Sequence, residues 1–172
     1  ILDFLRSCLL AGENPKWIST EPNFDDFYAI WDTFRATHPL FTLLTPSVQS
    51  NMVRSLIDIY RYEGYMPDAR SGNDNGRVQG GSNCDILIAD AMVKGISFDY
   101  ENAYRSALRN AATVSDNLTN GGRKKLNISN FIGYVPADEN ENFSWSMEGY
   151  INDYGIAQMA KKLADQTNDA TK

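Results

Sequence analysis

The sequence has few of the residues that metal sites and disulfide frameworks require. It contains two cysteines, Cys8 and Cys84, and one histidine, His38, among 172 residues. Two cysteines are too few for a disulfide framework, and one histidine excludes a histidine-rich metal site or a cysteine–histidine relay. We expect both cysteines to pack in the core as small apolar residues. A single Cys8–Cys84 bridge is the alternative.

Positive charge and long apolar runs are also scarce. The 16 lysines and arginines are outnumbered by 22 acidic residues, which gives a formal net charge of −6. This balance argues against binding to nucleic acid or to an anionic membrane surface. No apolar run approaches the roughly 20 residues of a membrane-spanning helix, and no signal peptide is visible. Because the chain begins at Ile1 rather than at methionine, we interpret it as a piece of a longer protein.

Apolar residues that recur every three or four positions predict a succession of helices. One helix ends near residue 10, and the others cover residues 23–38, 45–63, 83–94, 99–111 and 146–160. Thr45 and Asp99 are expected N-caps, and Gly64 suits the left-handed position after a helix. Residues 114–145 are expected to be irregular. The pattern predicts an all-α fold built from consecutive helical hairpins, as in an α/α toroid, although it also suits other helical folds.

A long loop, residues 65–82, joins two of these helices. Loops of this length are usually functional or disordered. The loop is rich in glycine and carries polar groups that suit a polyhydroxylated ligand: Asp68, Arg70, Asp74, Arg77 and Gln79. A solvated surface loop is the alternative. Oxygen ligands for calcium are available at Asp68, Asn73, Asp74 and Asn75, but their spacing does not follow the alternating calcium-loop pattern.

Trp31, Asp32 and Arg35 lie within one turn of a predicted helix. A tryptophan ring beside a carboxylate is a common way to hold a sugar, because the ring covers its C–H face while the carboxylate accepts hydroxyl hydrogen bonds. Alternatively, Trp31 belongs to the core and Asp32 pairs with Arg35 on the helix surface. We interpret His38 as a helix-end residue.

Glycoside hydrolysis needs two carboxyl groups on opposite sides of the scissile bond. The available carboxyl groups are Asp32, Asp68, Asp85, Asp90, Glu148 and Asp153. Nothing local selects an acid and a base from them. Asp90 lies inside an apolar helix, so we expect it to be buried, structural and matched by a helix cap or an arginine.

Three glycosylation sequons begin at Asn117, Asn127 and Asn142. One sequon carries little information, but three within one polar region indicate passage through a secretory route if the organism glycosylates its proteins.

Taken in order, several motifs resemble the catalytic domain of glycoside hydrolase family 92, the exo-acting α-mannosidases, and most closely its fungal members. They are Asp25-Asp26-Phe-Tyr-Ala-Ile-Trp31-Asp32-Thr-Phe-Arg35 with His38-Pro39-Leu40, Gly64-Tyr-Met-Pro67-Asp68-Ala-Arg70, Gly80-Gly81-Ser-Asn83-Cys-Asp85 with Ala89-Asp90-Ala91 and Lys94-Gly95, Gly133-Tyr134-Val135-Pro136, Ser146-Met-Glu148-Gly-Tyr150, and Asn152-Asp153-Tyr. Together they span most of the chain.

The resemblance implies that residues 1–172 form an incomplete part of an (α/α)₆ barrel. It also implies a calcium ion at the sugar site and hydrolysis with inversion. It places Trp31 and Asp32 in the sugar pocket, so we expect the substrate-binding residues to be Trp31, Asp32, Arg35, Asp68, Arg70 and Arg77. The family's general acid lies in an Asn-Glu-Pro box and its base in a Gly-Asn-Asp-Asp run before Met-Ser. Neither is present, and Gly72-Asn73-Asp74 is not followed by Met-Ser.

We therefore expect a secreted, calcium-dependent exo-α-mannosidase acting on a mannose-containing glycan, of which this chain is part. The calcium ligands, the catalytic acid and base, the remaining barrel and an N-terminal β-sandwich domain are expected outside residues 1–172, so the chain alone is expected to be inactive. Many family members carry a histidine where Ser82 stands, which leaves the linkage open. The alternatives are a non-catalytic carbohydrate-binding helical module and a structural helical-repeat scaffold.

Overall fold

A computed structural model describes residues 18–24, 26–27, 29–71, 74–75, 81–116 and 121–167. Its elements, in chain order, are β1 (Asp26–Phe27), α2 (Ile30–Thr33), α3 (Thr37–Leu44), α4 (Pro46–Glu63), β2 (Arg70–Ser71), β3 (Asp74–Asn75), α5 (Cys84–Val93), α6 (Tyr100–Ala112), α7 (Leu126–Ile132) and α8 (Asn142–Thr167). The three short strands form one antiparallel sheet in the order β1-β2-β3, with Asp26 opposite Ser71 and Arg70 opposite Asn75.

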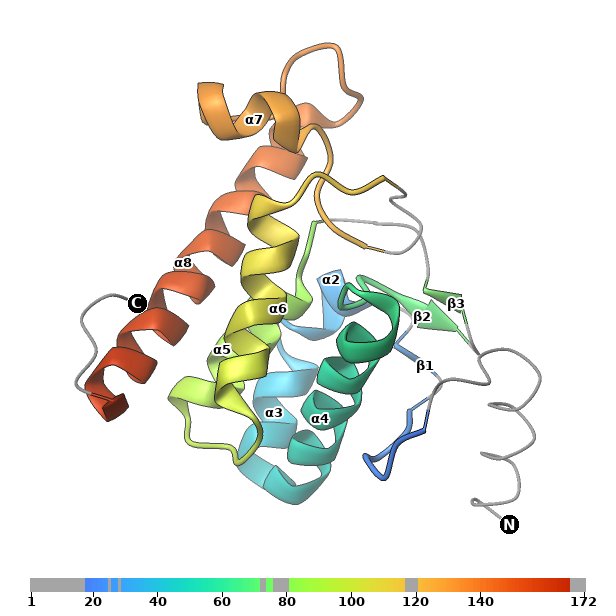
Figure 1. Ribbon diagram of the computed structural model, residues 1–172, viewed down its shortest axis with the longest axis vertical. Helices are drawn as coiled ribbons and strands as arrows, with labels where there is room; N and C mark the ends of the chain where they lie inside the picture. The colour runs from blue at the N-terminus through green and yellow to red at the C-terminus, as the bar shows by residue number, and fades with distance from the viewer. Residues whose placement is uncertain are drawn as a thin grey trace.

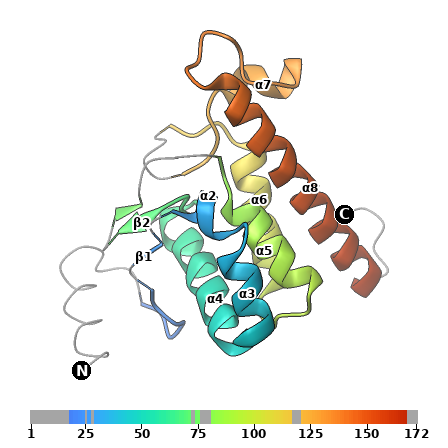
Figure 2. The same cartoon turned by 180° about the vertical axis from the view of Figure 1, so that it is seen from behind.

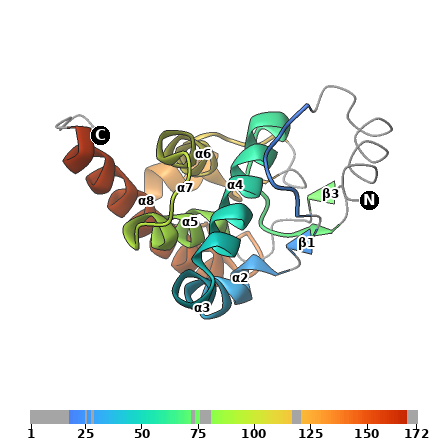
Figure 3. The same ribbon diagram turned by 90° about the horizontal axis from the view of Figure 1, so that it is seen from below.

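The helices pack around α5, which contacts α3, α4, α6 and α8 (Figures 1 and 3). Helices α3 and α4 are joined by Thr45 alone, and α5 and α6 by residues 94–99, so each pair forms a helical hairpin. The long helix α8 runs along α5, and α7 crosses its N-terminal end (Figure 2). The predicted all-α class is confirmed, and the hairpins are those expected of part of an (α/α)₆ barrel. The small sheet is the one departure.

Helices α4 and α5 follow the sequence closely. Helix α4 starts with Pro46 and ends at Gly64, whose φ of 86° is left-handed, as predicted. Thr45 lies at the N-cap position, but its side chain does not cap the helix, because its hydroxyl donates to the Phe41 carbonyl instead. Its predicted stripe is buried at Val53, Leu56, Ile57 and Ile59, and partly buried at Met52 and Tyr60. Helix α5 is apolar nearly all round and is the predicted inner helix, with Leu87, Ile88, Ala89, Ala91 and Met92 all buried.

Helix α6 confirms the predicted cap, because the Asp99 carboxylate accepts a hydrogen bond from the Asn102 N–H at 3.0 Å. Its buried face includes Ala103 and Ala107, whereas the apolar Leu108 is exposed. Alanine side chains at this contact let α6 lie close to the helices it packs on.

The single helix predicted for residues 23–38 is wrong. The chain instead forms β1, the short helix α2 and then α3, which begins at Thr37. Pro39 lies in the first turn of α3, where its missing N–H has no intrahelical partner to lose. His38 is therefore buried in a first turn rather than placed at a helix C-terminus, and the interpretation of it as a terminal residue is corrected.

The region predicted to be irregular, residues 114–145, contains α7 and the start of α8. Helix α7 is only seven residues long and buries Leu126, while Phe131 and Ile132 are exposed, so it carries little periodic signal. Helix α8 begins at Asn142, four residues before the predicted start at Ser146. Trp145 in its first turn packs on Val135, and this contact fixes the loop that precedes the helix.

Gly155 sets how closely α8 approaches α5. A Cβ there would lie 3.2 Å from both Ala89 Cβ and Ile86 Cα, which are rigid helix atoms, whereas a Cβ at Gly149 meets nothing within 4 Å. Alanine gains about 1 kcal/mol of helix propensity over glycine at either site. We expect Gly155→Ala to be less stable than Gly149→Ala by about 1–3 kcal/mol, the cost of overpacking. Urea unfolding of both variants measures the difference. Equal stabilities would contradict the prediction, because they would mean that α8 can shift away from α5 without a measurable cost.

Candidate functional site

Helix α2 and the turn that follows it present Trp31, Asp32 and Arg35 to the surface. Its neighbours Ile30 and Phe34 are buried in the core, so these three side chains must point outward. Trp31 is 41% exposed. The Asp32 carboxylate makes no ion pair or hydrogen bond within the described part of the chain, and the Asp32–Arg35 side-chain pair considered above is not formed. A large ring and a carboxylate are thus both accessible on one short helix.

Arg35 ties this helix to the beginning of α8. Its Nη2 forms an ion pair with Glu148 Oε1, its Nε donates to the Trp31 carbonyl at 3.2 Å, and its guanidinium lies 4.6 Å from the centre of the Phe34 ring. This pair brings together two motifs that are more than 100 residues apart in the sequence. Arg35 therefore holds the backbone carbonyl of Trp31 in place relative to α8.

Asp68 and Arg70 are buried rather than displayed. Arg70 Nη1 donates to both carboxylate oxygens of Glu63, at 3.0 and 3.1 Å. Asp68 Oδ1 accepts a hydrogen bond from the Asn83 N–H at 3.4 Å. These contacts hold the segment after α4 against the end of α4 and the start of α5. Arg77, the remaining predicted substrate-binding residue, lies outside the described residues.

Gly81 is packed against polar side chains that have unused hydrogen-bonding capacity. Its φ is +139°, and a Cβ there would lie 3.1 Å from Glu148 Cβ and 3.2 Å from Asn152 Nδ2. Asn152 Nδ2 donates to Asn83 Oδ1 at 3.1 Å. Asn83 Nδ2, Asn152 Oδ1 and Glu148 Oε2 are buried and lack a hydrogen-bond partner in the part of the chain that the structure describes. Such groups are costly unless a ligand, water or further protein satisfies them.

Beside Gly81 lies an ionic network that runs from the buried Asp85 to the exposed Asp153, here called the Arg123 cluster (Ser82, Asp85, Asn110, Arg123 and Asp153). Asp85 is fully buried and accepts hydrogen bonds from Ser82 Oγ at 2.6 Å, Asn110 Nδ2 at 2.9 Å and Arg123 Nη2 at 3.2 Å. Arg123 Nε also donates to Ser82 Oγ, and its Nη1 donates to Asp153 Oδ1 at 2.6 Å. One guanidinium therefore links the start of α5 to α8.

Burial raises the pKa of Asp85 to about 6, although Arg123 and the hydrogen bonds of Ser82 and Asn110 act in the opposite direction. A carboxyl group with a raised pKa is a candidate proton donor. Asp85, however, is enclosed by the Arg123 cluster and has no exposed surface. We therefore assign it a structural role in this chain.

A cavity of about 250 Å³ opens between α7, α8 and the segment 121–126. Its walls include Gly81, Arg123, Tyr134, Trp145, Tyr150 and Asp153. None of the substrate-binding residues predicted from the sequence lines it. It is nevertheless adjacent to the Trp31–Asp32 surface, because Gly81 lines the cavity and also packs on Glu148, the partner of Arg35.

The histidine and the described cysteine are structural. His38 Nδ1 lies 3.0 Å from Gln49 Oε1, and burial lowers the pKa of the imidazole, which favours its neutral form. Cys84 is buried as predicted and unpaired, its thiol donates to the Pro67 carbonyl, and burial raises its pKa. Cys8 lies outside the described residues.

The expectation that Asp90 is buried is wrong. It is partly exposed on α5 and pairs with Lys94 one turn later, at 2.8 Å. Asp90 lies at the partly solvated side of α5, where the side chain of Lys94 reaches it instead of a helix cap or an arginine.

Two of the three sequons fall on described residues. Asn127 is exposed near the start of α7. Asn142, the first residue of α8, is partly buried, and its Nδ2 donates to the Val135 carbonyl at 3.4 Å. Glycosylation modifies this nitrogen, so Asn127 is the more accessible of the two. Asn117 lies outside the described residues.

Within the described residues, no group of three or more histidine, cysteine, aspartate or glutamate side chains is placed to hold a metal ion. Asp68 is turned into the protein, where it accepts a hydrogen bond from the Asn83 N–H. The other three oxygen ligands considered for calcium lie in the segment 72–80, whose side chains are outside the described residues. In the same described part of the chain, no helix has the length and apolar character to cross a membrane.

Sequence reasoning missed two residues that organise this site. Nothing in the local sequence singles out Arg123, which follows two glycines in a region predicted to be irregular. Asn152 belongs to the Asn152-Asp153-Tyr motif, but the motif by itself assigns it no role. Glu148 and Asp153 were among the carboxyl groups considered, but their partners, Arg35 and Arg123, are revealed only by the packing of α8.

Comparison with known proteins gives a consistent result. A family model for the glycosyl hydrolase family 92 catalytic domain matches residues 11–172. An uncharacterized secreted glycosidase of Arthroderma benhamiae is 30% identical over 91% of this chain and 18% of its own length.

Two solved structures from Bacteroides thetaiotaomicron are also similar. One is an inverting family GH92 mannosidase, 34% identical, with a TM-score of 0.74 over 80% of this chain and 19% of that one. The other is a family GH92 α-mannosidase, 32% identical, with a TM-score of 0.74 over 87% of this chain and 20% of that one. The chain thus spans about a fifth of the length of each of these relatives.

Proposed function

Because this chain belongs to glycosyl hydrolase family 92, we propose that it forms part of the catalytic domain of an exo-acting, inverting α-mannosidase that releases terminal mannose from glycans. The match of residues 11–172 to the family's catalytic-domain model carries this proposal, and the likeness to two mannosidase structures supports it. Inversion needs an acid and a base about 6.5–9.5 Å apart. We place both outside this chain, since the family's Asn-Glu-Pro and Gly-Asn-Asp-Asp motifs are absent from its sequence.

The Trp31–Asp32 surface is the proposed contact with the terminal mannose. The accessible indole of Trp31 offers a face to the C–H groups of the sugar, and the Asp32 carboxylate is available to accept hydroxyl hydrogen bonds. Arg35 positions the pair through its bonds to Glu148 and to the Trp31 carbonyl. Asp68 and Arg70 contribute indirectly, because their hydrogen bonds hold the segment after α4 in place.

Calcium is proposed as the cofactor of the full-length enzyme. When bound, it would assist distortion of the mannose ring. The described residues of this chain do not fit a calcium site built from side-chain carboxylates, because they provide no cluster of three histidine, cysteine, aspartate or glutamate side chains. We accordingly assign the calcium ligands to other parts of the full-length protein.

The exposed face of α8 supports the proposal that more of the barrel packs against this chain. Phe143, Met147, Ile151 and Tyr154 are spaced at three and four residues and are all solvent-exposed. An apolar stripe on one side of a long helix is normally covered. We propose that further barrel helices cover it, and that an N-terminal β-sandwich domain completes the pocket. Secretion is proposed from the sequons and from the secreted fungal relative.

The test is the kinetics of Trp31 and Asp32 variants in the full-length protein. Asp32→Asn removes a charge-assisted hydrogen bond worth about 1.5–3 kcal/mol, so kcat/KM for an α-linked mannobiose should fall by one to two orders of magnitude. Trp31→Ala should weaken binding through the lost ring contact. Leu43→Ala, at an exposed position on α3, is the matched control. Unchanged kcat/KM in both site variants would refute the assignment.

A further inference from the structure

The cavity between α7 and α8 has the lining of a carbohydrate subsite. Tyr134 and Tyr150 are each about half exposed and both line it, while the buried Trp145 forms part of its wall. Aromatic faces bind the C–H face of a sugar ring. Ser129, Asn130 and Asp153 add hydroxyl, amide and carboxylate groups to the same walls. At about 250 Å³ the space is below the roughly 300–1,000 Å³ of sites for drug-sized ligands, so it suits a unit as small as one sugar ring.

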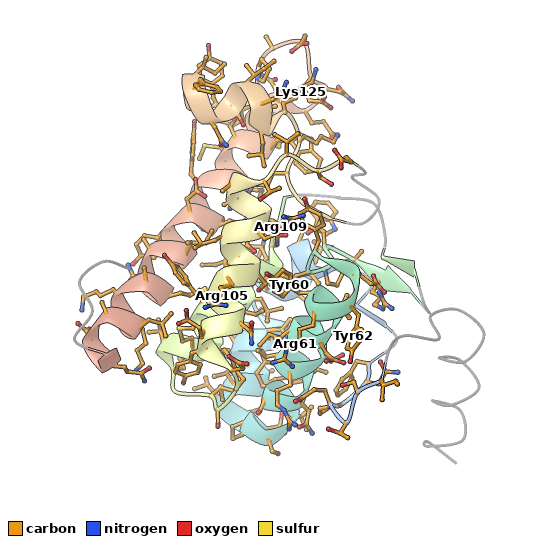
Figure 4. All side chains as sticks on the ribbon, in the orientation of Figure 1. Tyr60, Arg61, Tyr62, Arg105, Arg109 and Lys125 are labelled. Atoms are coloured by element: carbon orange, nitrogen blue, oxygen red, sulfur yellow. The ribbon has the colours of Figure 1, made fainter. Side chains whose placement is uncertain are left out.

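The charges around the cavity are matched in pairs. Arg123 binds Asp85 and Asp153, and Lys124 Nζ lies 3.1 Å from Glu139 Oε1 and 4.3 Å from the centre of the Trp145 ring. The neighbouring Lys125, labelled beside α7 in Figure 4, pairs with Asp138 at 3.2 Å. Since each cation already has a carboxylate partner, the cavity favours a neutral, hydroxyl-rich ligand over an anion.

Buried polar atoms connect this cavity with the Trp31–Asp32 surface. Gly81 lines the cavity, a Cβ at this position would lie 3.1 Å from Glu148 Cβ, and Glu148 forms an ion pair with Arg35. Glu148 Oε2 and Asn152 Oδ1 have no hydrogen-bond partner in the described part of the chain. Gly149, next to Glu148, also lines the cavity. The two surfaces therefore adjoin, with unsatisfied acceptors at their boundary.

We propose that the cavity between α7 and α8 is a second sugar subsite, which binds a neutral pyranose of the glycan other than the terminal mannose held on Trp31 and Asp32. This inference rests on the proposed function. The ring of Tyr134 supplies the stacking face, and the paired charges of Arg123 and Lys124 hold the walls in place. The subsite selects substrates with a sugar on the leaving side.

The test compares two substrates in the full-length protein: an α-linked mannobiose and α-mannosyl fluoride, whose leaving group is a single atom. Tyr134→Ala should lower kcat/KM for the mannobiose about five- to tenfold, through loss of the aromatic contact. It should leave kcat/KM for the fluoride within twofold. Tyr134→Phe retains the ring and should behave like the wild type on both substrates. Phe131→Ala is the matched control, because Phe131 is 87% exposed on α7 and does not line the cavity.

The possible outcomes separate this inference from the proposed function. A wild type that hydrolyses both substrates, with Tyr134→Ala changing both equally or neither, overturns the subsite while the mannosidase stands. A wild type that hydrolyses neither refutes the proposed function. In that event calorimetric titration with the mannobiose judges the subsite directly: binding that Tyr134→Ala weakens supports it, and no binding, or equal binding by the variant, overturns it.

Discussion

The chain on its own is expected to release no mannose from an α-1,2-linked mannobiose, with or without calcium, whereas the full-length protein should release it. Hydrolysis with inversion needs an acid and a base on opposite sides of the glycosidic bond. Of the carboxyl groups described here, Asp85 is enclosed by the Arg123 cluster, Glu148 is held by Arg35 and Asp68 by the start of α5. Ligand binding through Trp31 and Tyr134 does not accelerate the reaction unless it is stronger in the transition state.

The assay measures mannose released by the chain and by the full-length protein at equal concentration, each with calcium and with a chelator. Circular dichroism must first establish that the isolated chain is helical, so that inactivity is not mistaken for unfolding. A chelator should abolish turnover by the full-length protein. Calcium-stimulated turnover by the chain alone would contradict the proposal and place the acid and base among its own carboxyl groups.

Replacing Arg123 with leucine is expected to cost about 3–5 kcal/mol of stability at pH 8, the typical effect of leaving a buried charge without its partner. Arg123 is almost buried, and it contacts the fully buried Asp85 as well as Ser82 and Asp153. Urea unfolding of the chain measures the loss. Lys161→Leu is the matched control: it breaks an exposed pair with Asp165 on α8 and should cost at most about 0.5 kcal/mol.

The loss caused by Arg123→Leu should shrink at low pH. The pKa of Asp85 is raised to about 6 in the folded protein from an ordinary value of 3.8. A raised pKa means that the contribution of this group to stability is fully present below about pH 4 and is lost as the pH rises through about 6. Below pH 4 the Asp85 carboxyl is neutral in both folded proteins, so Arg123 has no Asp85 charge to match and keeps only its pair with the exposed Asp153. Equal losses at pH 4 and pH 8 would mean that Arg123 contributes packing rather than charge compensation.

Removing the carboxylate separates these effects further. In the background of Asp85→Asn, Arg123→Leu should show no such difference between pH 4 and pH 8. His38 acts in the opposite direction, because its lowered pKa gives stability that is lost as the pH falls. It is common to all the variants, so its contribution cancels when they are compared at the same pH.

Helices with strong local signals were predictable. In α4, Pro46 and Gly64 mark the two ends and an apolar stripe marks the buried face; in α5 the apolar residues run nearly all round. The prediction of one helix over residues 23–38 failed, because apolar residues at helical spacing also suit a short strand, a single helical turn and a second helix that begins around Pro39. Helix α7 is too short to show a period, and long-range packing rather than propensity decides such segments.

The sequence by itself determined the helical class, the ends of α4 and α6, and the motifs that mark family membership, because each depends on residues close together along the chain. Only the tertiary structure decided which of the marked residues meet. Arg35 pairs with Glu148, 113 residues away, rather than with Asp32, and Arg123 is the partner of Asp85, 38 residues away, because the tertiary fold brings these distant segments together. Local spacing carries no information on such contacts, since burial of apolar surface brings the helices together and the charges must then find partners in the packed protein.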